Sequence, residues 1–305
     1  MKKKLLKAIL IVFVVIYIIY SPSAFGILNS ELLINKKENI DYQIMELWNV
    51  DTFEGGSNSR ASFLEKCAIQ YEKNNKGKFF IIKNYTPQQA LNKLSQNNIP
   101  SMISFGMGFG KSIKNYLIKM KNHNVRSDLM ECGRLNNVTF AVPYILGGYS
   151  LIYSGDEIDN VTVFNSEYIS PTEAIKYLNL TKISQSNLGS FDVYDGYVNQ
   201  KYSCILGTQR DVYRCNNRNK NGKGNNKFKY IEGYSDLLQF IGITSYEWQE
   251  ECENFVDFIL SDTCQNALTQ INMFNVLRCN YYTDELYRDF EISLNKKLET
   301  RNAFE

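Results

Sequence analysis

Hydrophobic and polar positions alternate with two different periods in the first half of the chain. Residues Tyr42–Val50, Lys78–Ile82 and Pro100–Gly106 are short apolar runs typical of buried strands. The first two runs are separated by apolar residues at helical spacing, namely Phe63, Leu64, Cys67, Ala68 and Tyr71. A second helix is predicted from Thr86-Pro87 to Asn97, because threonine caps helices and proline fits their first turn. Strand and helix therefore alternate, which predicts a parallel α/β lobe.

This alternation changes after a further predicted helix at Lys111–Lys121. Val138–Ser154 holds two apolar runs around Pro143 and Gly147-Gly148, and we interpret it as two extended segments that form a first crossing between two lobes. Further strands are predicted at Lys201–Gly207 and Phe228–Glu232. Further helices are predicted at Pro171–Leu178, from Arg210, and at Tyr246–Gln270, and the polar tail Asp284–Glu305 is a helix or a frayed end.

The beginning of the chain has a pattern of its own. Lysines occupy positions 2, 3 and 4, and thirteen apolar residues run from Ala8 to Tyr20. Small residues at 24 and 26 suit a signal peptidase, and the apolar run is short for a membrane-spanning helix, which needs roughly 20 residues. We therefore expect residues 1–26 to be a signal peptide or, if it stays uncleaved, a membrane anchor. The protein is expected to be exported, either extracellular or at the cell surface.

Length and charge limit the organisation and the partners. A body of this size favours two lobes, and we expect lobe 1 at 27–140, lobe 2 mainly at 141–270 with hinge crossings, and a C-terminal segment at 271–305. Without the leader the chain has 30 basic and 32 acidic residues. This balance lacks the basic character of nucleic-acid binding, so we expect no nucleic-acid partner. The basic stretch Asn219–Lys229 is rich in glycine and asparagine, as solvated loops are.

The cysteines and the histidine do not predict a metal site. Seven cysteines occur, none at the spacing C-x-x-C, and His123 is the only histidine. We expect no metal ion and no cofactor. Cys67, Cys252 and Cys264 fall on apolar helix faces, where a thiol packs as a small hydrophobic group.

Motifs of common enzymes are also missing, including GxSxG, HExxH and the Walker sequence. We therefore expect a protein that is not an enzyme. An extracellular carbohydrate-active hydrolase remains an alternative, with Glu54 and Asp211 as its pair of carboxylates. A membrane-tethered sensor or interaction protein is the other alternative.

Three loops have the form of ligand sites at the carboxyl ends of strands. Trp48–Arg60 contains two glycines that expose backbone N–H groups, and its aromatic residues offer stacking surface. Ser104–Gly110 is rich in glycine, which suits a loop that cradles phosphate but is more typical of a plain flexible loop. Gly207–Arg214 places donors and an acceptor at a helix start, which suits either a ligand or an internal salt-bridge cap.

The order of six segments resembles the extracellular solute-binding proteins of ABC importers, of the sugar-binding type known as family 1. These segments are Glu46–Leu64 (ELWNVDTFEGGSNSRASFL), Pro100–Gly106 (PSMISFG), Ala141–Ile152 (AVPYILGGYSLI), Gly207–Arg218 (GTQRDVYRCNNR), Tyr234–Ile243 (YSDLLQFIGI) and Phe255–Leu268 (FVDFILSDTCQNAL). The resemblance implies an α/β, two-lobed periplasmic-binding-protein-like fold of type II with a hinge between the lobes. It further implies an interlobe cleft that closes on a small solute, expected to be a sugar, and delivery of that solute to the permease subunits of an ABC importer.

The resemblance also assigns candidate ligand-binding residues. In the first loop they are Trp48, Phe53, Glu54, Gly56 and Arg60. In the second lobe they are Gln209, Arg210, Tyr213 and Arg214, and near the first crossing they are Tyr144 and Tyr149. In such a cleft, aromatic faces pack on the apolar face of a sugar ring while polar groups pair with its hydroxyls.

Overall fold

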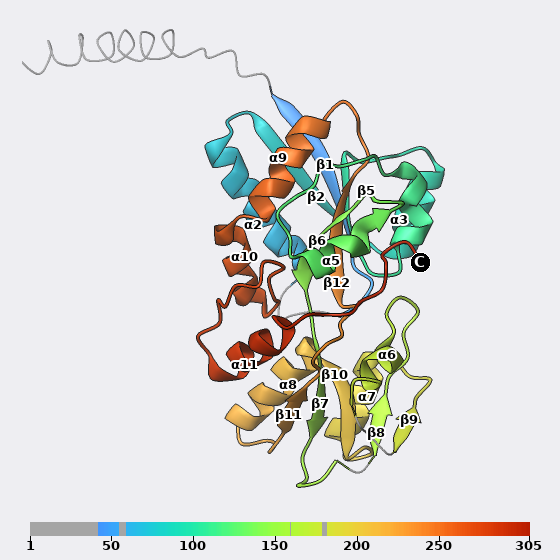
Figure 1. Cartoon of the computed structure of the whole chain (residues 1–305), viewed down its shortest axis with the longest axis vertical. Helices are drawn as coiled ribbons and strands as arrows, with labels where there is room; N and C mark the ends of the chain where they lie inside the picture. The colour runs from blue at the N-terminus through green and yellow to red at the C-terminus, as the bar shows by residue number, and fades with distance from the viewer. Residues whose placement is uncertain (1–41, 55–58, 159, 179–181) are drawn as a thin grey trace, which may run out of the picture. The chain divides into compact units, whose positions relative to one another are not determined.

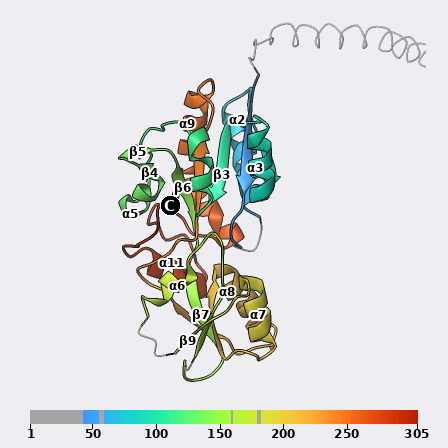
Figure 2. The same ribbon diagram turned by 90° about the vertical axis from the view of Figure 1, so that its right-hand side faces the viewer.

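Two five-stranded sheets organise the computed structural model, which describes residues 42–54, 59–158, 160–178 and 182–305 (Figure 1). The predicted leader at 1–26 and the candidate Gly56 lie outside the described residues. Each sheet with its helices is called a lobe below, and the two views in Figures 1 and 2 show one lobe at each end of the unit formed by residues 43–305.

The sheet of lobe 1 has the strand order β2-β1-β3-β12-β6. Its strands are β1 (Gln43–Val50), β2 (Lys78–Tyr85), β3 (Met102–Gly106), β6 (Val142–Leu146) and β12 (Leu238–Ile243). Strand β1 is parallel to β2 and β3, whereas β12 is antiparallel to both of its neighbours. Residues of β3, β6 and β12 are all buried, which accounts for their continuous apolar sequences.

Helices cover both faces of this sheet. Helices α2 (Arg60–Asn74) and α9 (Gln249–Ile259) contact each other on one face, and α3 (Pro87–Ser95) packs against β1 and β2 from the other (Figure 1). The remaining elements of this lobe are α4 (Gly110–Ile113), η1 (Lys114–Tyr116), α5 (Ser127–Met130), η2 (Glu131–Gly133), β4 (Arg134–Leu135), β5 (Val138–Thr139), α10 (Asp262–Ala267) and η3 (Leu268–Ile271). Helix α11 (Glu285–Leu294) contacts lobe 2, where the Phe290 ring stacks on Tyr230 of β11.

The sheet of lobe 2 has the strand order β11-β7-β10-β8-β9. Its strands are β7 (Tyr149–Tyr153), β8 (Val161–Val163), β9 (Ile183–Gln185), β10 (Cys204–Thr208) and β11 (Lys227–Tyr230), and its helices are α6 (Pro171–Ile175), α7 (Ser190–Val198) and α8 (Gln209–Lys220). Both α7 and α8 pack against β10, the central strand.

In the described part of the chain, two segments lead from a strand of one sheet to a strand of the other. The first crossing is Gly147-Gly148, between β6 and β7, as the glycine pair in the sequence predicts. Close packing requires glycine here, because a Cβ on Gly148 would lie 2.5 Å from the Phe290 ring. The second crossing runs from β11 to β12, so residues after lobe 2 complete the sheet of lobe 1.

Most elements of the first half agree with the sequence-based prediction. Strands β1 to β3 and helices α2 and α3 lie where they were expected, and Ser59 and Thr86 cap the two helices. Cys67, Cys252 and Cys264 are buried free thiols, as predicted.

Two predictions of helical structure need correction, and for the tail one of the two predicted alternatives, a helix, holds at Glu285–Leu294. The predicted helix at Lys111–Lys121 ends at Tyr116, because the following residues pair with the chain beside them: Ile118 N–H donates to Ile243. The predicted helix at Tyr246–Gln270 is divided at Ser261, whose side chain caps a new helix, α10. The tail is ordered beyond α11, and Phe304 is buried near its end.

The sequence analysis did not identify β8, β9, α7 and β12. Strands β8 and β9 are only three residues long, too short for a periodic pattern. In the part of the chain that the structure describes, no helix combines the length and the apolar character that a membrane span requires.

Candidate functional site

A cavity of about 310 Å³ lies between the two lobes, at the ends of strands from both sheets. Lobe 1 contributes Thr52, Phe53 and Glu54, which follow β1. Lobe 2 contributes the residues after β8, the start of α7 and the end of β10, namely Phe164, Asn165, Ser166, Ile169, Gly189, Ser190, Phe191, Asp192 and Thr208. Carboxyl ends of strands are the usual place for a ligand in open α/β sheets.

The lining combines aromatic rings with small polar groups. Three phenylalanines face four hydroxyl side chains and one amide, and the charged residues are Glu54 and Asp192. No lysine or arginine is found among the described residues that line the cavity. The Ser190 hydroxyl is buried and has no hydrogen-bond partner in the described part of the chain, so a polar group remains available to a ligand.

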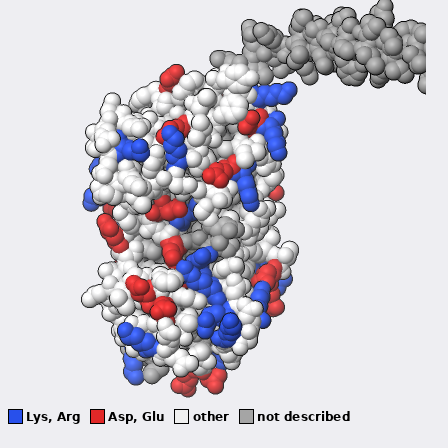
Figure 3. All heavy atoms as spheres, turned by 180° about the vertical axis from the view of Figure 1, so that it is seen from behind, with Lys and Arg blue, Asp and Glu red and all other residues white. Residues whose placement is uncertain are grey.

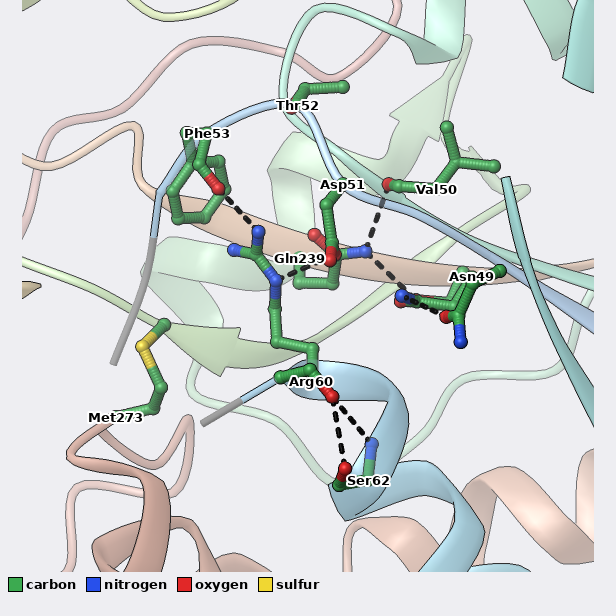
Figure 4. A network of polar contacts seen from close by, with 12 residues as sticks. Asn49, Val50, Asp51, Thr52, Phe53, Arg60, Ser62, Gln239 and Met273 are labelled. Carbon is green, nitrogen blue, oxygen red and sulfur yellow. Dashed lines mark hydrogen bonds and ion pairs between the residues drawn. The ribbon is translucent and has the colours of Figure 1, made fainter. Parts of the chain in front are cut away.

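The wall from lobe 1 is fixed by Arg60, at the start of α2 (Figure 4). The guanidinium lies 4.3 Å from the centroid of the Phe53 ring and donates a hydrogen bond to the Phe53 carbonyl. Its Nε donates to Asp51 at 2.7 Å, and the residue is only 3% exposed. These contacts hold Phe53 in place, and the Arg60 Nη1 atom is buried without a hydrogen-bond partner in the described part of the chain.

A buried amide connects β12 to the end of β1 behind this wall. The Gln239 Nε2 atom donates to the Val50 carbonyl at 3.2 Å and to the Ser104 hydroxyl at 2.9 Å (Figure 4). The Ser104 hydroxyl also contacts the Tyr144 hydroxyl at 2.8 Å. These polar groups pair with one another inside lobe 1, so they hold the loop after β1 in position.

Helix α8 begins at the wall from lobe 2. Thr208 caps the helix, and its backbone N–H donates in return to Asp211 at 3.0 Å, which completes a capping box. Asp211 is 1% exposed, and burial raises the pKa of its carboxyl to about 6, although the Thr208 N–H and Arg214 act in the opposite direction.

One ion pair joins the lobes beside the cavity. Arg214 on α8 donates from Nη1 to Glu54 Oε2 at 2.9 Å and from Nη2 to Glu54 Oε1 at 3.2 Å. Its Nη1 also donates to Asp211 at 3.0 Å. These carboxylates raise the pKa of Arg214, whose burial alone lowers it. The candidates Glu54 and Arg214, which come from different predicted loops, therefore bind each other.

Other candidate residues lie inside the lobes. Trp48 is fully buried, with its ring edge against Tyr85 and its N–H donating to Glu46. Tyr144 and Tyr149 are also fully buried, and the Tyr149 hydroxyl donates to Asp236 at 2.7 Å. Burial raises the pKa of both tyrosines. These three side chains occupy protein contacts and do not line the cavity.

The remaining candidates lie around the start of α8. Gln209 is fully buried, and its Oε1 accepts from the Gly148 N–H at 3.0 Å in the first crossing. The Arg210 guanidinium lies 5.7 Å from the Tyr213 ring centroid. Tyr213 lines a different cavity of about 320 Å³, together with Tyr281, Tyr282 and Tyr287.

The wall from lobe 2 contains the functional candidates that sequence reasoning missed. Residues 164–169 follow a strand of three residues, and residues 189–192 start a helix that the sequence analysis did not identify. A usable signal was present: Gly189 stands before Ser190 and Phe191, and Val193 and Tyr197 repeat at helical spacing.

The carboxylates suggested for a hydrolase are neighbours, because Glu54 and Asp211 both accept from the same Arg214 nitrogen. Asp211, however, does not line the cavity, and its oxygens accept from Arg214 and Thr208. In the described part of the chain, no cluster of three His, Cys, Asp or Glu side chains is arranged to hold a metal ion.

Comparisons by sequence find no relatives: no family model matches the chain, and no curated protein matches it. Comparisons of structure, in contrast, find proteins with a similar fold. The GacH receptor of Streptomyces glaucescens, solved unliganded and with acarbose, aligns with a TM-score of 0.59 at 10% identity, over 85% of this chain and 88% of the receptor.

Two further structures extend this comparison. The maltodextrin-binding protein MalE1 from L. casei BL23 has a TM-score of 0.58 at 10% identity, covering 85% of this chain and 87% of its own. The substrate-binding domain assigned to a molybdenum ABC transporter from Clostridium difficile has a TM-score of 0.51 at 12% identity, covering 76% of this chain and 99% of its own. The fold is therefore that of the two-lobed solute-binding proteins of ABC importers, as the sequence resemblance predicts.

Proposed function

We propose that this protein is the exported solute-binding component of an ABC importer, and that it holds a small sugar or related polyol in the cavity between its lobes. The observation that carries the proposal is the position of that cavity, which has walls from both lobes at the ends of β1, β8 and β10. Structural neighbours of the same fold include proteins that bind acarbose or maltodextrin, as their names state.

Binding to both walls explains how a solute would close the protein. A ligand that contacts Phe53 in lobe 1 and Asn165 in lobe 2 gains its full contacts only when the lobes are together. Such a ligand shifts the population toward the closed state by its difference in affinity for the two states. The two crossings would act as the hinge, and the closed form would be delivered to permease subunits in the membrane.

The lining favours an uncharged polyhydroxy solute over an oxyanion. Hydroxyl and amide side chains match the hydroxyls of a sugar, and the phenylalanine rings match its apolar face. Among the described lining residues no cation is offered to molybdate or sulfate, because Glu54 already binds Arg214 and Asp192 adds a negative charge. The volume of about 310 Å³ is near the lower limit of ligand sites, roughly 300 Å³, so we expect a small solute.

The contacts of Glu54 and Asp211 favour a binding protein over a hydrolase. Glycoside hydrolysis needs two carboxyl groups that both reach the substrate. Asp211 is buried at the helix start, and Glu54 is paired with Arg214. A sensor or interaction protein would need no solute, and the binding experiment below separates it from a transport component.

Calorimetric titration of the full chain, purified without refolding, tests the proposal. The probes are a panel of monosaccharides and disaccharides, with molybdate and sulfate as a second group. We expect at least one saccharide and neither oxyanion to bind. Asn165→Ala removes one polar partner from the cavity wall and should weaken that binding by about tenfold, the effect of a lost hydrogen bond of ~1.4 kcal/mol.

Asn98→Ala is the matched control, because Asn98 is exposed and lies outside the cavity. It should leave the affinity unchanged. An oxyanion that binds in place of every saccharide would overturn the proposed solute class. Failure of the whole panel to bind would favour a sensor or interaction protein.

A further inference from the structure

The ion pair between Glu54 and Arg214 differs from the other contacts between the lobes in its position. Glu54 lines the cavity, and its side chain is 43% exposed, so the pair lies at the border between cavity and solvent. The crossings at residues 147–148 and 231–237 are covalent links that remain when lobes rotate. Separation of the cavity walls, in contrast, must break the pair.

The arginine is held ready for this contact by its own lobe. Its guanidinium carbon lies 5.1 Å from the ring centroids of both Phe191 and Tyr194 on α7, and Asp211 binds it from the preceding turn of α8. The side chain is only 16% exposed. Because these contacts fix the guanidinium, little conformational freedom remains to be lost when Glu54 binds.

The geometry of the contact is also the strongest that an arginine makes. Two parallel N–H to oxygen bonds, at 2.9 and 3.2 Å, join the guanidinium and the carboxylate. Basic and acidic side chains both occur where the lobes meet in the view from behind (Figure 3). A bidentate pair with a fixed arginine is the kind of exposed ion pair that contributes measurably.

We infer that Glu54 and Arg214 form a latch that favours the closed arrangement of the lobes in the absence of any solute. The latch acts on the equilibrium between open and closed forms, and the two residues need not contact the solute. This inference goes beyond the proposed function and depends on it only for one consequence: a latch that slows opening also slows release of a bound solute.

Small-angle X-ray scattering of the solute-free full chain tests the latch. Glu54→Gln keeps the size of the side chain and removes its charge, so the radius of gyration should increase relative to the wild type. Arg214→Lys keeps the charge but removes the bidentate geometry, and it should produce a smaller increase. The wild type should expand when salt is raised from about 0.05 M to about 0.5 M, because the pair is partly exposed, whereas the Glu54→Gln variant should respond less.

Glu173→Gln is the matched control. Glu173 forms an ion pair with Lys176 inside lobe 2, and its side chain is 42% exposed, close to the value for Glu54. This control should scatter like the wild type at both salt concentrations. Thermal unfolding of each variant checks that it is folded.

An unchanged radius of gyration in Glu54→Gln at low salt overturns the latch. Loss of saccharide binding in that variant, without any change in scattering, also overturns it and makes Glu54 a ligand contact. The scattering measurements use no solute, so a negative result in the saccharide panel leaves the test of the latch intact.

Discussion

At the scale of single residues, Asp211 and Glu54 both bind Arg214, but their different surroundings give the two carboxylates different roles. Asp211 is buried at the helix start and binds the backbone, whereas Glu54 is half-exposed and reaches across from the other lobe. Desolvation raises the pKa of Asp211 to about 6, because the charged form loses its water. The same residue type therefore serves as a structural cap in one case and as an interlobe contact in the other.

This difference predicts a pH dependence for Asp211. Between about pH 4 and pH 6 the folded protein holds the Asp211 proton that the unfolded chain has released, so stability falls as the pH rises. Relative to Asp211→Asn, the wild type should lose up to about 3 kcal/mol of unfolding free energy over this range. Urea denaturation of both proteins at several pH values measures it. Parallel pH profiles for the two proteins would contradict the prediction.

At the scale of elements, side-chain caps decide where helices begin. Ser59, Thr86, Thr208, Ser261 and Asp284 each accept a hydrogen bond from a backbone N–H in the first turn of the following helix. The sequence analysis used the second of these caps, Thr86, correctly. It missed Ser261, because the apolar residues on both sides continue at helical spacing and conceal the break.

The cap of α3 gives a prediction at this scale. Thr86 accepts from the Gln89 N–H at 3.2 Å, and its own N–H donates to Gln89 Oε1 at 2.9 Å. Thr86→Ala should lower the unfolding free energy by about 1 kcal/mol, because the Gln89 N–H loses the hydroxyl oxygen that accepts from it. Ser95→Ala, at the other end of the helix, is the control and should change stability by less than about 0.5 kcal/mol. Equal effects in urea denaturation would show that the cap has no special role.

At the scale of the whole unit, the C-terminal tail connects both lobes. Its Leu298 N–H donates to Asp128 at 2.9 Å in lobe 1, and the Arg301 Nη1 donates to Ser170 at 2.8 Å in lobe 2. Hydrogen bonds from Arg126 and from Leu298 lower the pKa of Asp128 against the effect of its burial. The tail is therefore part of the packing between the lobes. The sequence had predicted either a helix or a frayed end there.

Phe304 near the end of this tail tests that role. It is 5% exposed, and its ring centroid lies 6.5 Å from that of Phe105 in β3. Phe304→Ala should cost about 3 to 5 kcal/mol, as truncation of a buried phenylalanine usually does. Tyr246→Ala is the control, because Tyr246 is 80% exposed, and it should change stability by less than about 0.5 kcal/mol. A thermal unfolding midpoint that is equal for both variants would exclude a structural role for the tail.

Much of lobe 1 could be predicted from the sequence, and only part of the site could. Phe53 and Glu54 were candidates and line the cavity, because a loop after a buried strand is a local pattern. Trp48, from the same loop, and Tyr144, near the first crossing, were also candidates, yet they are fully buried in lobe 1. An aromatic residue at a strand end has the same sequence pattern whether its ring points into the core or into a cleft.

The sequence by itself determined the order of strands and helices from β1 to β3, the starts of the helices between them and the glycine pair of the first crossing. Those features depend on contacts within a few residues, so periodicity and capping reveal them. Only the tertiary structure decided that Phe191 shares a cavity with Phe53, and that Arg214 binds Glu54, 160 residues away. Such pairs form because the strand ends of two different sheets meet, and no local pattern records which loops come together there.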